Sequence, residues 1–177
     1  KIYDDKSKKL PKKFKISRFK LKKTKFDFIV LSPGINKDVC NLKKFLLINK
    51  SKIISDLDIF YFKNIQNLKI CITGTNGKST TSKIIHKILK NAGLDARLVG
   101  NIGQPILNEK KITKKTVFVV EISSYQIEYS KYFKSDIAAI LNIFPDHLDR
   151  HKTFSNYRKI KFKLLKNLNP GGTGLIE

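Results

Sequence analysis

The segment at residues 70–80 reads ICITGTNGKST. Residues 70–72 are apolar, Gly74 and Gly77 follow, and the apolar positions after Ser79 recur with a helical period. A strand, a glycine loop and a helix in this order form the context of a phosphate-binding loop. Glycines let backbone N–H groups point at phosphate oxygens, and the helix N-terminus adds its dipole. The segment therefore predicts an α/β fold with a nucleotide site at this loop.

The residue types in the loop favour a nucleotide with Mg²⁺. The ammonium group of Lys78 would neutralise the terminal phosphates, and the hydroxyl of Ser79 would bind Mg²⁺. The general pattern G-x-x-x-x-G-K-[ST] is not met, because Ile72 stands where its first glycine belongs. A glycine turn capped by Ser79 or Thr80, without a ligand, is the structural alternative.

Strands and helices alternate along the chain on both sides of the loop. We expect strands at residues 26–31, 52–54, 70–73, 96–99, 117–122 and 137–141, helices at 38–49, 57–62, 79–91 and 154–168, and the start of another strand at 173–177. This alternation predicts a mostly parallel sheet with flanking helices. Because residues 63–69 are polar enough for a linker, we place a domain boundary near Gln66, between residues 1–66 and 67–177.

The formal net charge of +23 is compatible with nucleic-acid binding, because Lys and Arg neutralise phosphates. Of the 37 basic residues, however, only four are Arg, the side chain that reads guanine and binds phosphate in a bidentate fashion. We therefore expect no specific nucleic-acid partner. The densest basic run, residues 6–25, is expected to form solvated faces or a poorly ordered end.

Cysteine content and hydropathy indicate the cellular compartment and bear on membrane insertion. Cys40 and Cys71 are too few and too far apart for a metal knuckle or a disulfide framework, which favours a reducing compartment. The longest apolar uncharged stretch, residues 137–145, is shorter than the roughly 20 residues that a membrane-spanning helix needs. We expect a cytoplasmic protein without membrane insertion. Because the sequence contains no Met, we also expect it to be part of a longer gene product.

Two further segments follow predicted strands. Residues 121–128 read EISSYQIE, and residues 142–151 read NIFPDHLDRH. Open α/β sheets place their ligands at the carboxyl ends of parallel strands, and a carboxylate such as Glu121 suits Mg²⁺ there. From the residues alone, a capping role for Glu121 is the less favoured alternative to a Mg²⁺ ligand. Residues 142–151 are equally compatible with a metal cluster and with an ordinary polar loop.

Together with TGTNGKS at residues 73–79, these segments resemble the Mur ligases and the related folylpolyglutamate synthetases, enzymes that join a carboxylate to an amine. EISSYQIE is similar to ELSSFQLE of the D-glutamate-adding members, and residues 142–151 resemble their N-x-x-x-D-H-x-D-R element. GNIG at residues 100–103, SPGI at residues 32–35 and the pair Tyr157 and Lys161 fit the same family. The resemblance covers about residues 26–166.

This resemblance implies an ATP-dependent ligase that phosphorylates the carboxylate of UDP-N-acetylmuramoyl-L-alanine and adds D-glutamate to the acyl phosphate, in peptidoglycan precursor synthesis. It implies an ATP site at Gly74, Thr75, Asn76, Gly77, Lys78, Ser79 and Thr80. It implies Mg²⁺ ligands at Ser79, Glu121, His147 and a carbamylated Lys161. The catalytic groups would be Lys78, Lys161 and His147. Substrate contacts would come from Ser32, Pro33, Gly34, Asn101 and Ser123.

The resemblance also implies the domain organisation. Residues 1–66 would be the end of a Rossmann-like UDP-binding domain, and residues 67–177 the first half of a central ATPase domain. The rest of that domain and a C-terminal domain that helps bind D-glutamate would complete a monomeric enzyme, so we expect the 177-residue chain to be inactive alone. Two alternatives stay open: another amide-forming ligase of the superfamily, such as a folylpolyglutamate synthetase, and a basic nucleic-acid-binding module that retains a nucleotide loop.

Overall fold

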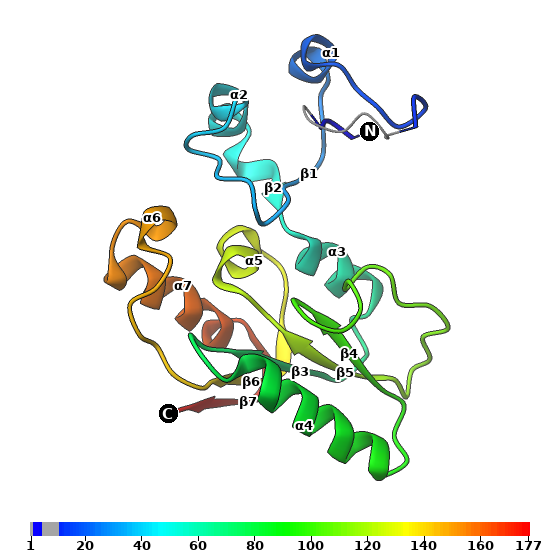
Figure 1. Cartoon of the computed structure of the whole chain (residues 1–177). Helices are drawn as coiled ribbons and strands as arrows, with labels where there is room; N and C mark the ends of the chain where they lie inside the picture. Colours follow the sequence, from blue (N-terminus) through cyan, green and yellow to red (C-terminus); the bar gives the residue numbers. More distant parts are fainter. Residues whose placement is uncertain (1, 5–10) are drawn as a thin grey trace. The chain divides into compact units, whose positions relative to one another are not determined.

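The computed structural model describes residues 2–4 and 11–177 and divides into two compact units (Figure 1). One unit comprises the described residues up to Ile29 together with Lys37–Ile53. The other comprises Val30–Asn36 and Ile54–Glu177. No helix in residues 2–4 and 11–177 is long and apolar enough to cross a membrane.

The first unit holds short helices. Helix α1 (Arg18–Lys23) buries only Leu21, so its lysines lie on an exposed face. Residues 6–10 of the basic run lie outside the described residues. Helix α2 (Lys43–Ile48) begins later than the sequence predicts, because the residues before it form turns; the Lys43 N–H donates to Cys40 O. A 3₁₀ turn, η1 (Lys50–Lys52), follows.

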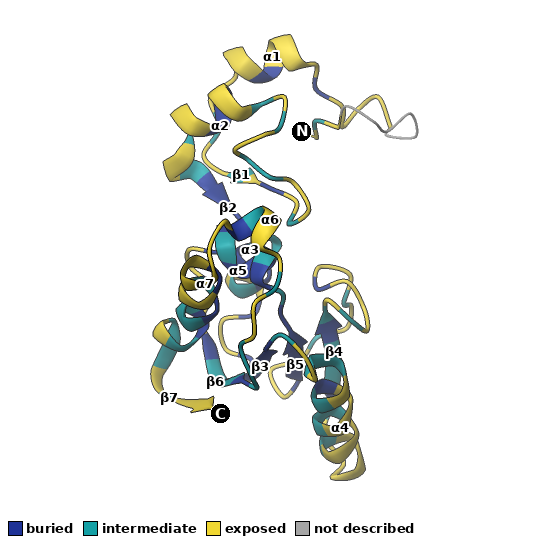
Figure 2. Ribbon diagram, turned by 60° about the vertical axis from the view of Figure 1, so that its left-hand side comes forward, coloured by how far each residue is buried: buried dark blue, intermediate teal, exposed yellow. Residues whose placement is uncertain are grey.

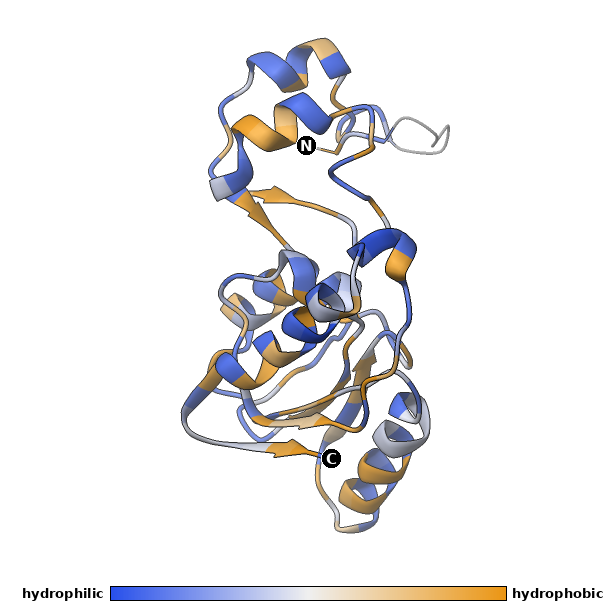
Figure 3. Ribbon diagram, turned by 90° about the vertical axis from the view of Figure 1, so that its left-hand side faces the viewer, coloured by the Kyte–Doolittle hydropathy of each residue, from blue (hydrophilic) through white to orange (hydrophobic). Residues whose placement is uncertain are grey.

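Two short strands, β1 (Ile29–Val30) and β2 (Ile53–Ile54), form a separate two-stranded sheet. Both are hydrophobic throughout, orange in Figure 3. Strand β1 covers only part of the predicted strand at residues 26–31.

The second unit is built on a five-stranded sheet in the order β4-β5-β3-β6-β7. The strands are β3 (Lys69–Thr73), β4 (Ala96–Gly100), β5 (Val117–Glu121), β6 (Ser135–Ile140) and β7 (Leu168–Ile176). All four pairings are parallel. Every residue of β5 is buried, dark blue in Figure 2, as expected for a strand covered on both faces. The prediction of a mostly parallel sheet with flanking helices is confirmed.

Helices cover both faces of this sheet. Helix α4 (Lys78–Asn91) lies on one face, and α3 (Asp56–Lys63), α5 (Ser124–Tyr129) and α7 (Phe154–Lys166) lie on the other (Figure 1). Helix α5 and the four-residue α6 (Leu148–His151) are absent from the sequence prediction, because segments this short show no helical period. Ser123 starts α5 with a capping box that pairs it with Gln126.

Helix α3 belongs to the core of the second unit. Leu57 and Phe60 lie in the same hydrophobic cluster as Cys71 of β3 and Phe118 of β5. The rings of Phe60 and Phe118 meet edge to face with centroids 4.8 Å apart. The boundary expected near Gln66 therefore falls inside this compact unit, while the assignment of residues 1–66 and 67–177 to two domains stays a prediction.

Asp58 ties α3 to the connection after α5. Its fully buried carboxylate accepts hydrogen bonds from the Ser55 N–H at 2.9 Å and the Ser130 hydroxyl at 3.1 Å. It also accepts from the three consecutive N–H groups of residues 131–133, the shortest at 2.7 Å. An anion that satisfies this many buried donors cannot be replaced without leaving some of them unpaired.

We expect Asp58→Asn to lower the free energy of unfolding by on the order of 3 kcal/mol, because the new amide nitrogen cannot accept these bonds. Urea unfolding followed by circular dichroism measures the change. The matched control is Asp27→Asn at an exposed position, which should stay within about 0.5 kcal/mol of wild type. Equal stabilities for the two variants would contradict the role of Asp58.

Candidate nucleotide and metal site

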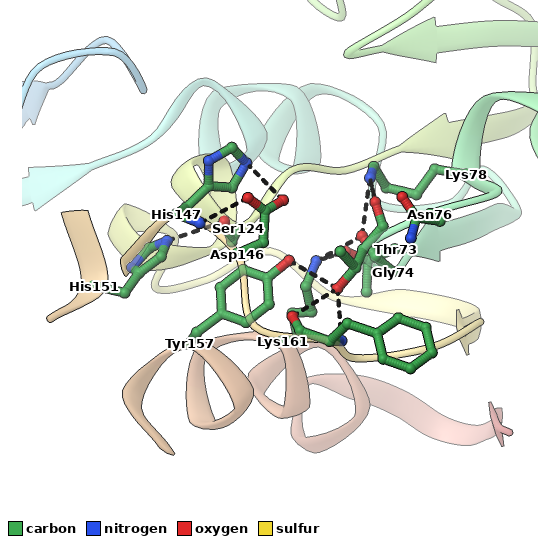
Figure 4. A network of polar contacts seen from close by, with 12 residues as sticks. Thr73, Gly74, Asn76, Lys78, Ser124, Asp146, His147, His151, Tyr157 and Lys161 are labelled. Carbon is green, nitrogen blue, oxygen red and sulfur yellow. Dashed lines mark hydrogen bonds and ion pairs between the residues drawn. The ribbon is translucent and has the colours of Figure 1, made fainter. Parts of the chain in front are cut away.

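The order of the strands brings three chain segments to one edge of the sheet. β3 lies between β5 and β6, with Ile72 in register with Glu121 and Ala139. Because all three strands are parallel, the segments that follow them leave at the same edge: the loop at residues 74–77, Glu121 with EISSYQIE, and residues 141–151. Helix α7 adds Tyr157 and Lys161 from the side (Figure 4).

The loop has the shape of an anion cradle. Gly77, at φ 79°, is the N-cap of α4 and adopts a conformation that glycine favours. In residues 2–4 and 11–177, the backbone N–H groups of residues 77–80 have no hydrogen-bond acceptor. Ser79 and Thr80 stand in the first turn of α4. The ammonium group of Lys78 folds back onto the loop and donates to Gly74 O at 2.9 Å and Thr75 O at 2.7 Å.

Lys161 reaches the same loop from α7. Its Nζ donates to Gly74 O at 2.8 Å and to the Thr73 hydroxyl at 3.3 Å, and the side chain is only 1% exposed. Burial, with a smaller contribution from the nearby Lys78 charge, lowers the pKa of Lys161 to about 7. The lowered pKa increases the share of neutral amine at neutral pH relative to an ordinary lysine.

Glu121 is a buried carboxylate with one oxygen unpaired. Its Oε1 accepts a hydrogen bond from Asn101 Nδ2 at 2.8 Å, whereas Oε2 is buried without any partner in the described chain. The GNIG turn lies directly against it: a Cβ on Gly100, at φ 108°, would meet Glu121 O at 2.3 Å. Leaving a buried carboxylate oxygen unpaired is costly, and a divalent cation is the natural partner for such an oxygen.

His147 belongs to a cluster of rings. It adopts a left-handed backbone with φ 52° at the start of α6, and its N–H donates to Asp146 Oδ1 at 2.8 Å. Its ring lies 4.9 Å from that of Tyr125 and 6.3 Å from that of Tyr157. The buried His151 stands between the same tyrosines, with Nε2 3.0 Å from the hydroxyl of Ser124.

Burial lowers the pKa of His151, which favours a neutral ring. Across the described ranges, 2–4 and 11–177, no group of three or more His, Cys, Asp and Glu residues gathers to hold a metal ion. The acids and histidines of residues 142–151 therefore do not form a metal cluster of their own. The candidate Mg²⁺ ligands Ser79, Glu121, His147 and Lys161 come from four different elements instead.

The remaining predicted substrate residues lie on turns. Ser32, Pro33 and Gly34 form a turn closed by a hydrogen bond from Ile35 N–H to Ser32 O at 2.9 Å. The Tyr129 hydroxyl donates to Ile35 O at 2.8 Å and so fixes this turn to α5. Asn101 lies beside Glu121, and Ser123 is the N-cap of α5.

Sequence reasoning gave Asn142 and Arg150 no role beyond membership of the N-x-x-x-D-H-x-D-R element, and it did not name Tyr129. Arg150 bonds the Glu128 carboxylate at 2.9 Å and the Tyr129 hydroxyl at 2.6 Å. The side chain of Asn142 bonds the phosphate loop. All three stand within or next to the motifs quoted above, but motif positions alone do not reveal which groups they touch.

Comparison with known proteins places the chain in a family. Residues 72–177 match the family model described as the Mur ligase middle domain. The UDP-N-acetylmuramoylalanine--D-glutamate ligase of Alkaliphilus oremlandii (strain OhILAs) is 41% identical over 142 residues, which cover 80% of this chain and 31% of that protein. The enzyme of the same name from Francisella tularensis subsp. novicida (strain U112) is 44% identical over 150 residues, 81% of this chain and 34% of that protein. The chain thus spans about a third of the length of these curated relatives.

Solved structures share the fold. A UDP-N-acetylmuramate:L-alanyl-gamma-D-glutamyl-meso-diaminopimelate ligase from Neisseria meningitides superposes with a TM-score of 0.58 at 16% identity, covering 90% of this chain and 54% of that one. MurF ligase from Thermotoga maritima, solved in complex with ADP, gives a TM-score of 0.53 at 21% identity, with 68% of this chain and 30% of that one covered.

The lowered pKa of Lys161 predicts a pH-dependent stability. From about pH 7 to the ordinary lysine pKa of 10.5, the unfolded chain holds a proton that the folded chain has released. The stability of wild type relative to Lys161→Met should therefore rise with pH across this window, by up to about 1.4 kcal/mol per pH unit, and level off on either side.

Urea unfolding in CO₂-depleted buffer at several pH values measures this difference. Lys83→Met, at an exposed position of α4, is the control and should give no such slope. A pH-independent difference between wild type and Lys161→Met would show that Lys161 keeps its ordinary pKa.

Proposed function

Because the chain belongs to the Mur ligase family, we propose that its full-length gene product is the ATP-dependent ligase that adds D-glutamate to UDP-N-acetylmuramoyl-L-alanine in cytoplasmic peptidoglycan precursor synthesis. One observation carries the proposal. Three features lie at a single edge of the sheet: the loop, whose N–H groups at residues 77–80 have no acceptor among the described residues; two lysine side chains bonded to Gly74 O; and a buried carboxylate with one oxygen unpaired within the same residues. A polyanion with a divalent cation complements all of these groups.

ATP phosphates bind at the N-terminus of α4 in this proposal. The free N–H groups of residues 77–80 and the helix dipole attract the phosphate oxygens. Lys78 exchanges its bonds to the loop carbonyls for the terminal phosphates, where a point charge stabilises the charge that develops during transfer. The γ-phosphoryl group passes to the substrate carboxylate, and the amine of D-glutamate attacks the acyl phosphate, releasing phosphate as the amide forms.

The residues present fit Mg²⁺, since the free Oε2 of Glu121 is the kind of hard oxygen ligand this ion prefers. Ser79, His147 and a carbamylated Lys161 would complete its protein ligands. When bound, the ion would neutralise phosphate oxygens and polarise the acceptor. Asn101 orients the Glu121 carboxylate through its 2.8 Å hydrogen bond.

Lys161 is suited to carbamylation by its surroundings. A neutral lysine amine attacks CO₂, forms an N–C bond and releases a proton, so a pKa of about 7 supplies the reactive form at neutral pH. The product is an anion beside the Lys78 cation. The change replaces a repulsion between two lysines with an attraction and provides oxygen atoms for Mg²⁺.

The UDP and muramoyl portions of the substrate would be bound by residues outside the phosphate loop. The Ser32–Gly34 turn would approach the UDP moiety, and Asn101 and Ser123 the muramoyl portion. Tyr129 holds the first of these turns to the helix that Ser123 caps, so the Ser32–Gly34 turn and Ser123 are linked through α5.

We expect the full-length gene product, supplied with ATP, Mg²⁺ and UDP-N-acetylmuramoyl-L-alanine, to release phosphate only when D-glutamate is added. A coupled phosphate assay with individual amino acids measures this. Phosphate release with glycine or L-lysine but not with D-glutamate would refute the assignment.

The matched variants are Lys78→Ala and Lys87→Ala, both on α4, the second at an exposed position. Lys78→Ala should lower kcat by about 100-fold or more, because the transferring phosphoryl group loses its charge partner. Lys87→Ala should leave turnover unchanged.

Glu121→Gln separates a metal ligand from a structural cap. The oxygen of the glutamine still accepts from Asn101, and a neutral amide nitrogen replaces Oε2, which has no partner in the described chain. We expect the ligand-free protein to be equally stable or about 1 kcal/mol more stable, with turnover reduced by about 100-fold. Thermal unfolding and the phosphate assay give the two readouts. A destabilised variant that keeps its turnover and its Mg²⁺ dependence would identify Glu121 as a cap.

A further inference from the structure

Asn142 makes a reciprocal set of hydrogen bonds with the phosphate loop. Its side-chain oxygen accepts from the N–H groups of Thr75 at 3.1 Å and Asn76 at 2.8 Å. Its side-chain nitrogen donates back to Asn76 O at 3.2 Å, and its backbone oxygen also accepts from the Thr75 N–H at 3.0 Å. One carboxamide thus occupies both the donor and the acceptor groups of the first turn of the loop.

The Thr75 hydroxyl adds a second connection between the same segments. It accepts from the Phe144 N–H at 2.9 Å, donates to Phe144 O at 3.2 Å and lies 3.2 Å from the Tyr157 hydroxyl. Residues 75–76 are therefore bonded to residues 142–144 through backbone and side chains together. Neighbouring bonds of this kind restrict the loop to one conformation before any ligand arrives.

The bonds divide the N–H groups of the loop into two sets. The N–H groups of Thr75 and Asn76 donate to Asn142, whereas the N–H groups of residues 77–80 have no acceptor in the described part of the chain. Two consecutive N–H groups that point at one oxygen form a nest suited to an anion. Here the neutral oxygen of Asn142 fills that nest, which leaves the later N–H groups and the α4 N-terminus for phosphate.

We propose that Asn142 is a positioning residue for the nucleotide: its carboxamide holds the first turn of the phosphate loop so that the N–H groups of residues 77–80 converge on the phosphates. This rests on the proposed function. An ordered loop binds its ligand without a further ordering cost. The amide is required rather than a carboxylate, because the carboxylate introduced by Asn142→Asp would face Asn76 O and add negative charge beside the triphosphate.

The same contacts connect the nucleotide to the segment that bears His147. Asn142 and His147 stand five positions apart on the same connection after β6.

The test compares Asn142→Ala, Asn142→Asp and the control Asn91→Asp in the full-length gene product. Asn91 lies at the far end of α4, about 20 Å from the loop, and undergoes the same chemical change. Calorimetry gives the Kd for ATP, hydrogen exchange gives the protection of the Thr75 and Asn76 amides, and steady-state kinetics give KM for ATP and kcat.

We expect Asn142→Ala to weaken ATP binding about 10-fold or more and to accelerate exchange at residues 75 and 76, with core amides of β3 and β5 unchanged. Asn142→Asp should weaken binding further, and raising the salt concentration should recover part of that loss. KM for ATP should rise more than kcat falls. Asn91→Asp should match wild type.

The outcomes separate this inference from the proposed function. If the wild-type protein binds no ATP, the proposed function is wrong and this inference is wrong with it. If wild type binds ATP, and the nearly isosteric Asn142→Asp protein keeps its core protection together with wild-type ATP affinity, Asn142 does not position the loop. Should Asn142→Ala not fold, the Asn142→Asp variant alone decides.

Discussion

The central place of β3 between β5 and β6 is the constraint on which the site depends. Parallel pairing fixes the register of Ile72 against Glu121 and Ala139, so the three segments leaving these strands share one edge. The buried residues of β5 and β3 hold this register, because a shift along the strand would disrupt close packing on both covered faces of the sheet. Glu121 is carried to the site as the last residue of a strand whose other members are all hydrophobic, Val117–Val120.

The ligand-free site has unfavourable electrostatics that the rest of the fold must offset. Two lysines bond to Gly74 O, and burial together with their weaker mutual repulsion lowers the pKa of Lys161. Glu121 Oε2 is buried without a partner in the described chain. Functional sites commonly depart from the rules that govern the remainder of a protein, at a cost in stability. By contrast, both oxygens of the equally buried Asp58 accept hydrogen bonds, and Asp58 stabilises the scaffold rather than a ligand.

The sequence predicts those parts of the structure that depend on local pattern. The strand, loop and helix around residues 70–80 and the mostly parallel sheet follow from apolar runs and glycine positions, and both are present. The short helices α5 and α6 cannot be predicted in this way, because caps and tertiary contacts rather than hydrophobic periodicity determine where they form. The packing of α3 with Phe118 likewise requires the fold, because the two lie far apart in sequence. Sequence resemblance names Lys161 and Glu121, but only the structure shows a depressed pKa in one and an unpaired oxygen in the other.

The connection after β6 links two parts of the second unit that sequence reasoning treated as separate. At its start, Asn142 is bonded to the phosphate loop, and near its end Arg150 pairs with Glu128 and bonds the Tyr129 hydroxyl. Tyr129 in turn holds Ile35 O, in the turn assigned to the UDP moiety. The Arg150 and Glu128 side chains are only 7% and 18% exposed, so their desolvation offsets much of their attraction. The geometry this pair imposes on Tyr129 therefore matters more than its net stability: through it, one segment sets the position of the Ser32–Gly34 turn relative to the loop that begins at Gly74.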